Sequence, residues 1–245
     1  MDKRFKLDMH THTVASGHAY STIDENARYA AQSGLELLGT TDHAPKMPGS
    51  THPLYFLNLK VVPRELHGIN LLMGAELNIM DSNGRVDLKN NLIKKLDYAI
   101  ASLHVPCIEP MDMEESTQAV ICAIKNPYIN IIGHPCDPRY PLNIREVVTV
   151  ARDNNTLLEI NNASLNPNNS RAGGEREILE LILECKKQQL PVILGSDAHF
   201  YSYIGGFGNI LPLLEEADMP DELIINTSVK AFTDFIALKK NMVKE

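Results

Sequence analysis

A repeating pattern of short apolar runs, polar loops and amphipathic stretches constrains the fold of this chain most. Several of the apolar runs are almost continuously hydrophobic, which is typical of parallel strands buried on both faces. The amphipathic stretches between them predict helices. The predicted strands are residues 5–9, 35–39, 70–74, 98–101, 129–132, 156–160 and 191–194.

Local signals predict three of the helices. Thr22 and Glu25 form a capping box, and helices are also predicted around residues 178–185 and 228–240. Strands that alternate with helices indicate an α/β fold with a parallel sheet and right-handed crossovers. Periodicity alone leaves open whether the sheet closes into a barrel. We expect residues 1–245 to form one domain. The apolar side of the last helix is predicted to carry Val229, Phe232, Phe235 and Leu238.

Composition excludes several classes of protein. The 245 residues are 44% hydrophobic and carry a net charge of −8, and the sequence contains no dense basic block beyond short pairs of lysines. Dedicated nucleic-acid binding, which needs clustered basic residues, is therefore not expected. The sequence contains neither a signal-peptide pattern nor a run of eighteen apolar residues, and its four cysteines form no CxxC pair. We expect a cytoplasmic protein with reduced thiols and no membrane association.

Histidines and carboxylates follow the predicted strands in phase. They come at or just after the carboxyl end of a run, and in parallel α/β folds those ends meet on one face. The clustering is therefore a consequence of the predicted topology. The candidate metal ligands are His10, His12, His18, His43, Glu76, His104, His134, Asp197 and His199.

Imidazole and carboxylate groups are suitable ligands for zinc, manganese or iron. In an extended segment His10 and His12 point to the same side, and Glu76 is the natural carboxylate to bridge two ions. Nine ligands exceed the needs of one or two ions, so three divalent ions are predicted. Asp42 is expected to orient a neighbouring histidine or to cap the next segment rather than to ligate. The isolated residues His52 and His67 are not expected to be metal ligands.

These residues together resemble the PHP family (polymerase and histidinol phosphatase), and more specifically its YcdX-like phosphatase branch. The resemblance rests on the motifs His10-Thr11-His12, Thr41-Asp42-His43, Gly133-His134-Pro135 and Ser196-Asp197-Ala198-His199, and it covers nearly the whole chain. It implies a distorted (β/α)7 barrel with parallel strands, a trinuclear site at the C-terminal face of the strands, and a homo-oligomer, often a trimer.

The resemblance also implies how the ligands divide among three ions, usually zinc, with manganese or iron in some relatives. One ion would be held by His10, His12, Glu76 and Asp197. The second would be held by His18, His43 and His199, and the third by Glu76, His104 and His134.

The chemistry expected from such a site is hydrolysis of a phosphomonoester by a metal-bridging hydroxide. Arg171 and Arg139 are the candidates for holding a substrate anion, because guanidinium binds phosphate in a forked geometry. No residue is assigned to protonate the leaving group. The polar loop 164–170 is expected to border the site and to influence substrate choice.

Three other functions remain open at this point. One is a histidinol-phosphate phosphatase, which uses a similar site. Another is a single-strand DNA exonuclease, which the acidic composition disfavours. The third is a metal-binding protein without turnover, which closed coordination would favour. The sequence does not identify the physiological substrate, the native metal or the oligomeric state.

Overall fold

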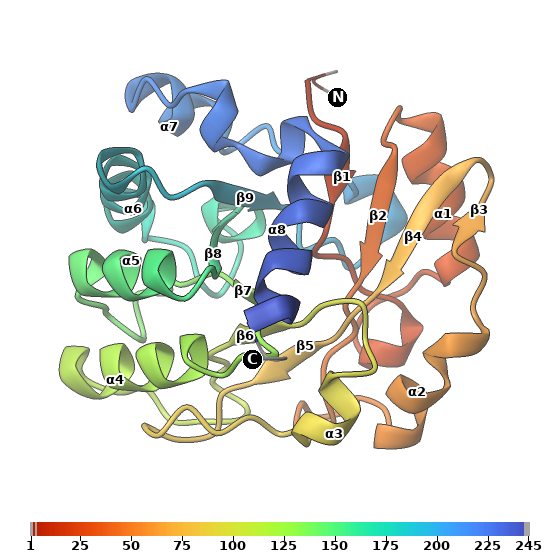
Figure 1. The fold of residues 1–245 in the computed structure, drawn as a ribbon, viewed down its shortest axis with the longest axis horizontal. Coiled ribbons are helices and arrows are strands. Elements are labelled where there is room, and N and C mark those ends of the chain that lie inside the picture. The colour runs from red at the N-terminus through yellow and green to blue at the C-terminus, as the bar shows by residue number, and fades with distance from the viewer. Residues whose placement is uncertain (1, 3, 243–245) are drawn as a thin grey trace.

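All seven predicted strands form, and they pair into two sheets (Figure 1). The computed structural model describes residue 2 and residues 4–242. The first sheet has the order β1-β2-β4-β3 and the second the order β5-β6-β7-β8-β9. The strands are β1 (Leu7–Asp8), β2 (Leu37–Thr40), β3 (Glu65–Leu66), β4 (Ile69–Met73), β5 (Glu76–Asn78), β6 (Ile100–Ser102), β7 (Ile131–Ile132), β8 (Leu157–Asn161) and β9 (Val192–Gly195).

The two sheets close into a distorted barrel. Except for the short antiparallel strand β3, all paired strands run parallel. β4 pairs with β2, and after Gly74 and Ala75 the same chain continues as β5 and pairs with β6. Isolated bridges join the sheet edges on both sides, between His43 and Glu76 and between Thr11 and Ala198. The predicted α/β barrel is therefore confirmed, with its third strand broken into β4 and β5.

Helices surround this ring of strands. The predicted capping box is present at α1, where the Thr22 side chain accepts from the Glu25 amide and the Glu25 carboxylate accepts from the Thr22 amide. Helix α5 packs against both α4 and α6 on one side of the barrel. The helices are α1 (Ile23–Gln32), α2 (Pro53–Asn58), α3 (Asn90–Ile93), α4 (Met113–Ile124), α5 (Ile144–Asp153), α6 (Glu175–Gln188), α7 (Leu211–Glu216) and α8 (Val229–Met242).

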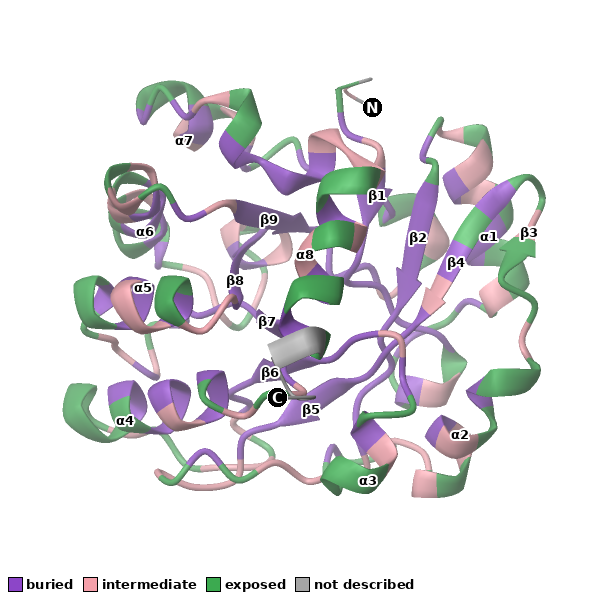
Figure 2. Cartoon of the chain, in the orientation of Figure 1, coloured by how far each residue is buried: buried purple, intermediate pink, exposed green. Residues whose placement is uncertain are grey.

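The interior of the barrel is a separate apolar cluster that α8 covers. Side chains of β1, β2, β6, β7, β8 and β9 meet Phe232 and Ile236 of α8, which crosses the ring of strands (Figure 1). A larger cluster fills the space between the strands and the surrounding helices. Figure 2 shows this arrangement as strands that are buried, apart from β3 and parts of β4, and as helices whose outward faces are exposed.

Helix α8 forms close to its predicted range, and Val229, Phe232 and Phe235 of the predicted apolar side pack against the cluster inside the barrel. Phe232, Ile236 and Lys239 are buried, whereas Leu238 is 53% exposed. The helix therefore turns the Ile236 and Lys239 side toward the barrel. Among the described residues, no helix combines the length and the apolarity needed to cross a bilayer.

Candidate metal centre

The predicted ligands lie together beyond the carboxyl ends of the strands. His10 and His12 follow β1, His43 follows β2, and Glu76 opens β5. His104, His134 and the pair Asp197 and His199 follow β6, β7 and β9, and His18 lies in the loop before α1. All except His18 and His199 are buried; His18 is exposed and His199 is partly exposed.

Glu76 stands at the centre of the cluster and faces five imidazoles. Its Oε1 lies 3.0 Å from His134 Nε2, 3.2 Å from His104 Nε2 and 3.4 Å from His10 Nε2. Its Oε2 lies 2.7 Å from His43 Nδ1 and 3.5 Å from His12 Nε2. One carboxylate therefore reaches five imidazoles from four segments of the chain, an arrangement that suits the predicted bridging role.

The two carboxylate oxygens of Asp197 face different partners. Oδ1 lies 3.2 Å from His12 Nε2 and 3.6 Å from His10 Nε2. Oδ2 accepts from Asn161 Nδ2 at 3.4 Å and from an Nη2 hydrogen of Arg171. Asp197 thus contacts the imidazoles on one side and a guanidinium on the other.

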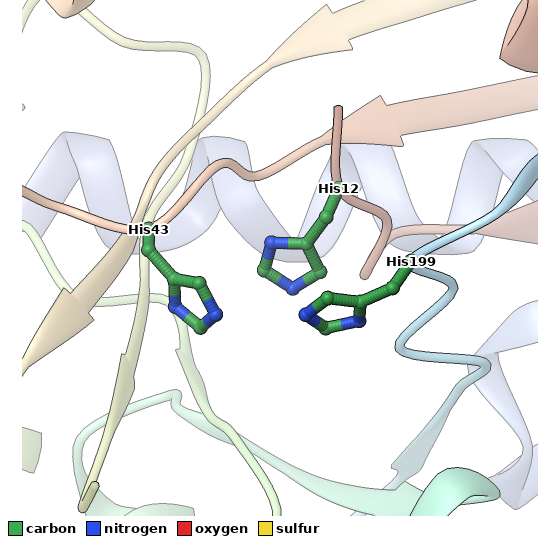
Figure 3. A group of neighbouring side chains, drawn as sticks. All are labelled: His12, His43 and His199. Carbon is green, nitrogen blue, oxygen red and sulfur yellow. The ribbon is translucent and has the colours of Figure 1, made fainter. Parts of the chain in front are cut away.

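Three imidazoles converge where β1, β2 and β9 end (Figure 3). The rings of His12 and His43 have centroids 4.4 Å apart, and those of His12 and His199 are 4.2 Å apart. One possible ligand atom from each of these three lies within 4.8 Å of the others. The His18 ring stacks on the rings of His43 and His199 with centroids 4.9 Å from each. His18 therefore lies on the outer side of this group.

Hydrogen bonds fix which nitrogen of three histidines faces the centre. His10 Nδ1 lies 2.6 Å from Glu159 Oε1, and His104 Nδ1 lies 2.8 Å from Asn78 Oδ1. Both partners are acceptors, so each Nδ1 carries the proton and Nε2 is left to face the cluster.

His12 is oriented through a serine. Its Nδ1 lies 2.9 Å from Ser16 Oγ, whose own hydroxyl donates to Asp42 Oδ1 at 2.7 Å. Since the serine proton points to Asp42, the Nδ1 of His12 donates and its Nε2 faces the cluster. Asp42 also accepts from the Tyr55 hydroxyl and from the Thr13 amide. Asp42 thus orients a neighbouring histidine, as predicted, rather than joining the cluster.

Six buried atoms of the cluster residues lack a hydrogen-bond partner of suitable geometry among the described residues. An unpaired buried polar atom costs about 1–3 kcal/mol, so several in one place require a compensating ligand. Divalent cations would bind such atoms, and the donor set of imidazoles and carboxylates suits these ions. The atoms are His10 Nε2, His12 Nε2, His43 Nδ1, Glu76 Oε2, His104 Nε2 and His134 Nδ1.

The protonation states at the centre also suit cations. Burial would raise the pKa of Glu76, but His104, His10 and His43 hold it well below its usual range. Burial lowers the pKa of His104, and burial with nearby His43 and His199 lowers the pKa of His18 to about 4. The carboxylate of Glu76 is therefore anionic and the imidazoles of His18 and His104 are neutral, the forms that ligate metals. His10 differs, because burial would lower its pKa but Glu159, Glu76 and Asp197 raise it well above the usual value.

Backbone geometry next to the ligands is specialised. His134 and Asp197 have φ angles of 30° and 54°, uncommon for residues other than glycine. Glycine is required at position 195, because a Cβ there would lie 1.8 Å from Glu159 Oε1. This close approach lets Glu159 reach His10 and also accept from the His134 amide at 2.7 Å.

Four residues that support the ligands were not assigned a role from the sequence. Glu159 is the most detectable, since a carboxylate inside a buried strand such as β8 needs a partner. The other three lie at positions that sequence spacing does not mark. The four are Ser16, Asn78, Ser102, which donates to Glu76 Oε1 at 2.8 Å, and Glu159.

A pocket of about 440 Å³ opens over the centre. Both predicted arginines line it, but they differ in their partners. Arg139 donates from Nε and Nη2 to the two oxygens of Asp137, at 2.8 and 2.6 Å. Arg171 donates to Asp197 and, from Nε, to Ser164 Oγ at 3.0 Å. Apolar side chains of Met47, Pro48, Val105 and Pro106 form other parts of the wall.

Known proteins resemble this chain in sequence and in fold. A "probable phosphatase" of Clostridium novyi is 48% identical over 236 residues, covering 96% of each chain. A "probable phosphatase" of Acetivibrio thermocellus is 44% identical over 98% of this chain and 99% of that protein.

A solved structure shares the fold at low sequence identity. It is the histidinol phosphate phosphatase of Lactococcus lactis in complex with zinc, L-histidinol and phosphate, with a TM-score of 0.60 and 17% identity. The alignment covers 88% of this chain and 94% of that one. The PHP domain model matches residues 8–163. The chain therefore belongs to the PHP domain family.

Proposed function

We propose that this protein is a metal-dependent phosphatase that hydrolyses small phosphomonoesters. The observation that carries the proposal is the set of buried, unpaired ligand atoms around Glu76 at the floor of the pocket. Membership of the PHP family and relatives named as phosphatases support the same activity.

We assign the ligands to three divalent cations, with zinc as the first candidate. His12 can serve one ion only, because its Nδ1 is engaged by Ser16 and its Nε2 alone is free. Its nearness to Asp197 and Glu76 supports a place in the set with His10. The three proposed sets are His10, His12, Glu76 and Asp197; His18, His43 and His199; and Glu76, His104 and His134.

Bound cations would supply Lewis acidity to a phosphoryl group and lower the pKa of water. The chain's own residues then bind and orient the substrate. We assign the phosphoryl contact to Arg171, which touches the proposed ligand Asp197. Arg139 shares its charge with Asp137 and forms part of the outer wall, where the leaving group would lie.

The pocket supports a small substrate with mixed character. Its volume of about 440 Å³ and its two arginines suit a compact phosphorylated molecule. The apolar part of the lining favours a leaving group with an apolar part. Histidinol phosphate belongs in the panel of substrates to be tested, since a protein with the same fold was solved with histidinol and phosphate.

The decisive experiment measures metal content and phosphatase activity together. We expect about three ions per chain in the purified protein, and p-nitrophenyl phosphate hydrolysis that a chelator abolishes and added metal restores. Full metal content without hydrolysis of any phosphoester would instead indicate a non-catalytic metal protein. Activity that survives complete metal removal would overturn the proposal.

A further inference from the structure

A directional chain of hydrogen bonds holds Arg171 at the mouth of the pocket. The arginine side chain is only 12% exposed. Its Nη2 donates to Asp197 Oδ2, and its Nε donates to Ser164 Oγ at 3.0 Å. Nη1 makes no hydrogen bond to any described residue and stays free for a ligand.

The donors and acceptors along this series of hydrogen bonds determine where each proton lies. Ser164 lies in the 3₁₀ helix η3 (Ala163–Leu165), and both its amide and its hydroxyl donate to Asn161 Oδ1, at 2.9 and 3.0 Å. The serine hydroxyl is thus committed as a donor, so its oxygen must accept from Arg171. Asn161 Nδ2 in turn donates to Glu159 Oε2 at 3.1 Å and to Asp197 Oδ2 at 3.4 Å.

The support for Ser164 is buried, whereas the loop that carries Arg171 is not. Asn161, the last residue of β8, and Ser164, in the 3₁₀ helix that follows, are 2% and 4% exposed. Residues 166–168 and 170, which lead to Arg171, include no buried position. Without Ser164 the long arginine side chain would keep Asp197 alone as its side-chain partner in this part of the structure.

We propose that Ser164 is a positioning residue that pre-orients the Arg171 guanidinium to bind a phosphoryl oxygen of the substrate. The inference rests on the proposed phosphatase function and extends it to a residue outside the ligand cluster. An arginine held in place before the substrate arrives loses less side-chain freedom on binding, which strengthens binding without a new contact.

A double-mutant cycle on the metal-loaded protein tests this role. We expect Ser164→Ala to raise the KM for p-nitrophenyl phosphate and the Ki of inorganic phosphate roughly 3- to 10-fold, with kcat within about 2-fold. In the Arg171→Ala background the same change should have no further effect, because Ser164 acts through Arg171. Multiplicative effects of the two substitutions, or an unchanged KM in Ser164→Ala, would overturn the proposal.

Two variants guard against loss of folding as an explanation. Ser164→Thr keeps the hydroxyl and should restore the wild-type KM. Arg171→Lys keeps the charge but lacks both Nε and the free Nη1, so it should raise the KM, and Ser164→Ala should add no further effect in the Arg171→Lys background. Ser33→Ala, on the surface at the end of α1, is the matched control and should behave as wild type.

Calorimetric titration of metal-loaded protein with inorganic phosphate separates this inference from the proposed function. A wild-type protein that binds phosphate but hydrolyses no ester would refute the phosphatase and leave the role of Ser164 measurable. Equal phosphate affinity in wild type and Ser164→Ala would refute the role of Ser164 alone.

Discussion

The carboxylate of Glu76 contacts more of the predicted ligands than a single ion pair would require. It contacts five imidazoles and is fully buried, so no water can replace its charge. We predict that Glu76→Gln lowers the metal content by at least one ion per chain and reduces phosphatase activity by roughly 100-fold or more. Metal analysis and p-nitrophenyl phosphate assays test this. Glu180→Gln, on the exposed face of α6, should change neither quantity.

Glu159 acts one step further out, through His10. Its Oε1 holds His10 Nδ1 and its Oε2 accepts the His134 amide, so one carboxylate orients two predicted ligands. A glutamine at this position keeps the size but replaces one acceptor with a donor. We predict that Glu159→Gln weakens metal binding by roughly 10- to 100-fold. Competition with a chelator of known affinity measures the change, and unaltered affinity would show that the orientation of His10 does not matter.

At the scale of elements, the capping box of α1 stabilises the segment that follows the loop of His12 and His18. Its hydrogen bonds are on the surface, between Thr22 and Glu25. We predict that Thr22→Ala lowers the melting temperature by roughly 2–4 °C. Glu25→Ala should have a similar effect, and the double variant should lose little more, because each residue needs the other. Additive losses would show that the box does not act as a unit.

Helix α8 carries a buried lysine whose ionisation depends on folding. Lys239 Nζ donates to Ile124 O at 3.3 Å and to Thr156 Oγ1, and burial lowers its pKa to about 7. The unfolded chain keeps the ordinary pKa of 10.5, so between pH 7 and 10.5 it binds more protons than the folded chain. The contribution of Lys239 to the free energy of unfolding therefore rises with pH across that window.

This linkage predicts a pH-dependent effect of Lys239→Met. At pH 7 and below, the variant avoids the burial of a charged ammonium group and should be more stable than wild type. The advantage should shrink, by a few kcal/mol, as the pH rises toward 10. Urea unfolding of both proteins from pH 6 to 10 measures the difference in their free energies of unfolding. The effects of the other titrating groups cancel in this difference, because both proteins contain them. A constant difference across this range would contradict the prediction.

The elements show what could and could not be read from the sequence. Buried parallel strands leave continuous apolar runs, so all seven were predictable to within about two residues at most of their ends. The hairpin between β3 and β4 was missed, because β3 has two residues and its turn, at His67 and Gly68, depends on positive φ angles. The buried face of α8 was partly wrong, because the shape of the barrel floor selects Ile236 and Lys239 over Leu238.

The candidate site follows the same logic. Most of its members were predictable because they follow strands, and topology gathers those ends. Their supporting partners were not predictable, since Asn78 and His104, or Glu159 and His10, meet only through the fold. The exclusion of His67 agrees with its place on the surface, bonded to Asp24. His52 likewise caps α2 rather than joining the cluster.

For the whole molecule, the proposed metal centre coincides with the seams between the two sheets. The bridge between His43 and Glu76 joins two predicted ligands directly. The bridge between Thr11 and Ala198 is flanked by further predicted ligands on both strands. At these two places the bridges are isolated backbone pairs, and the carboxylates and imidazoles lie on or beside them. Cations bound there would tie the two sheets together.

We therefore predict that the metals stabilise the barrel and not only the reaction. Ions bind the folded chain, because strand ends far apart in the sequence assemble their ligands. At 1,000 times the dissociation constant this contributes about 4 kcal/mol. Complete chelation should lower the melting temperature by on the order of 10 °C, and added zinc should restore it. Hydrogen exchange should increase first at the amides of His12 and Ala44, which pair across the seams.

The variant His67→Ala should respond to chelation as wild type does. In Glu76→Gln the response should be much smaller. An equal melting temperature with and without metal would show that metal binding does not stabilise the fold and that the protein itself holds the two sheets together.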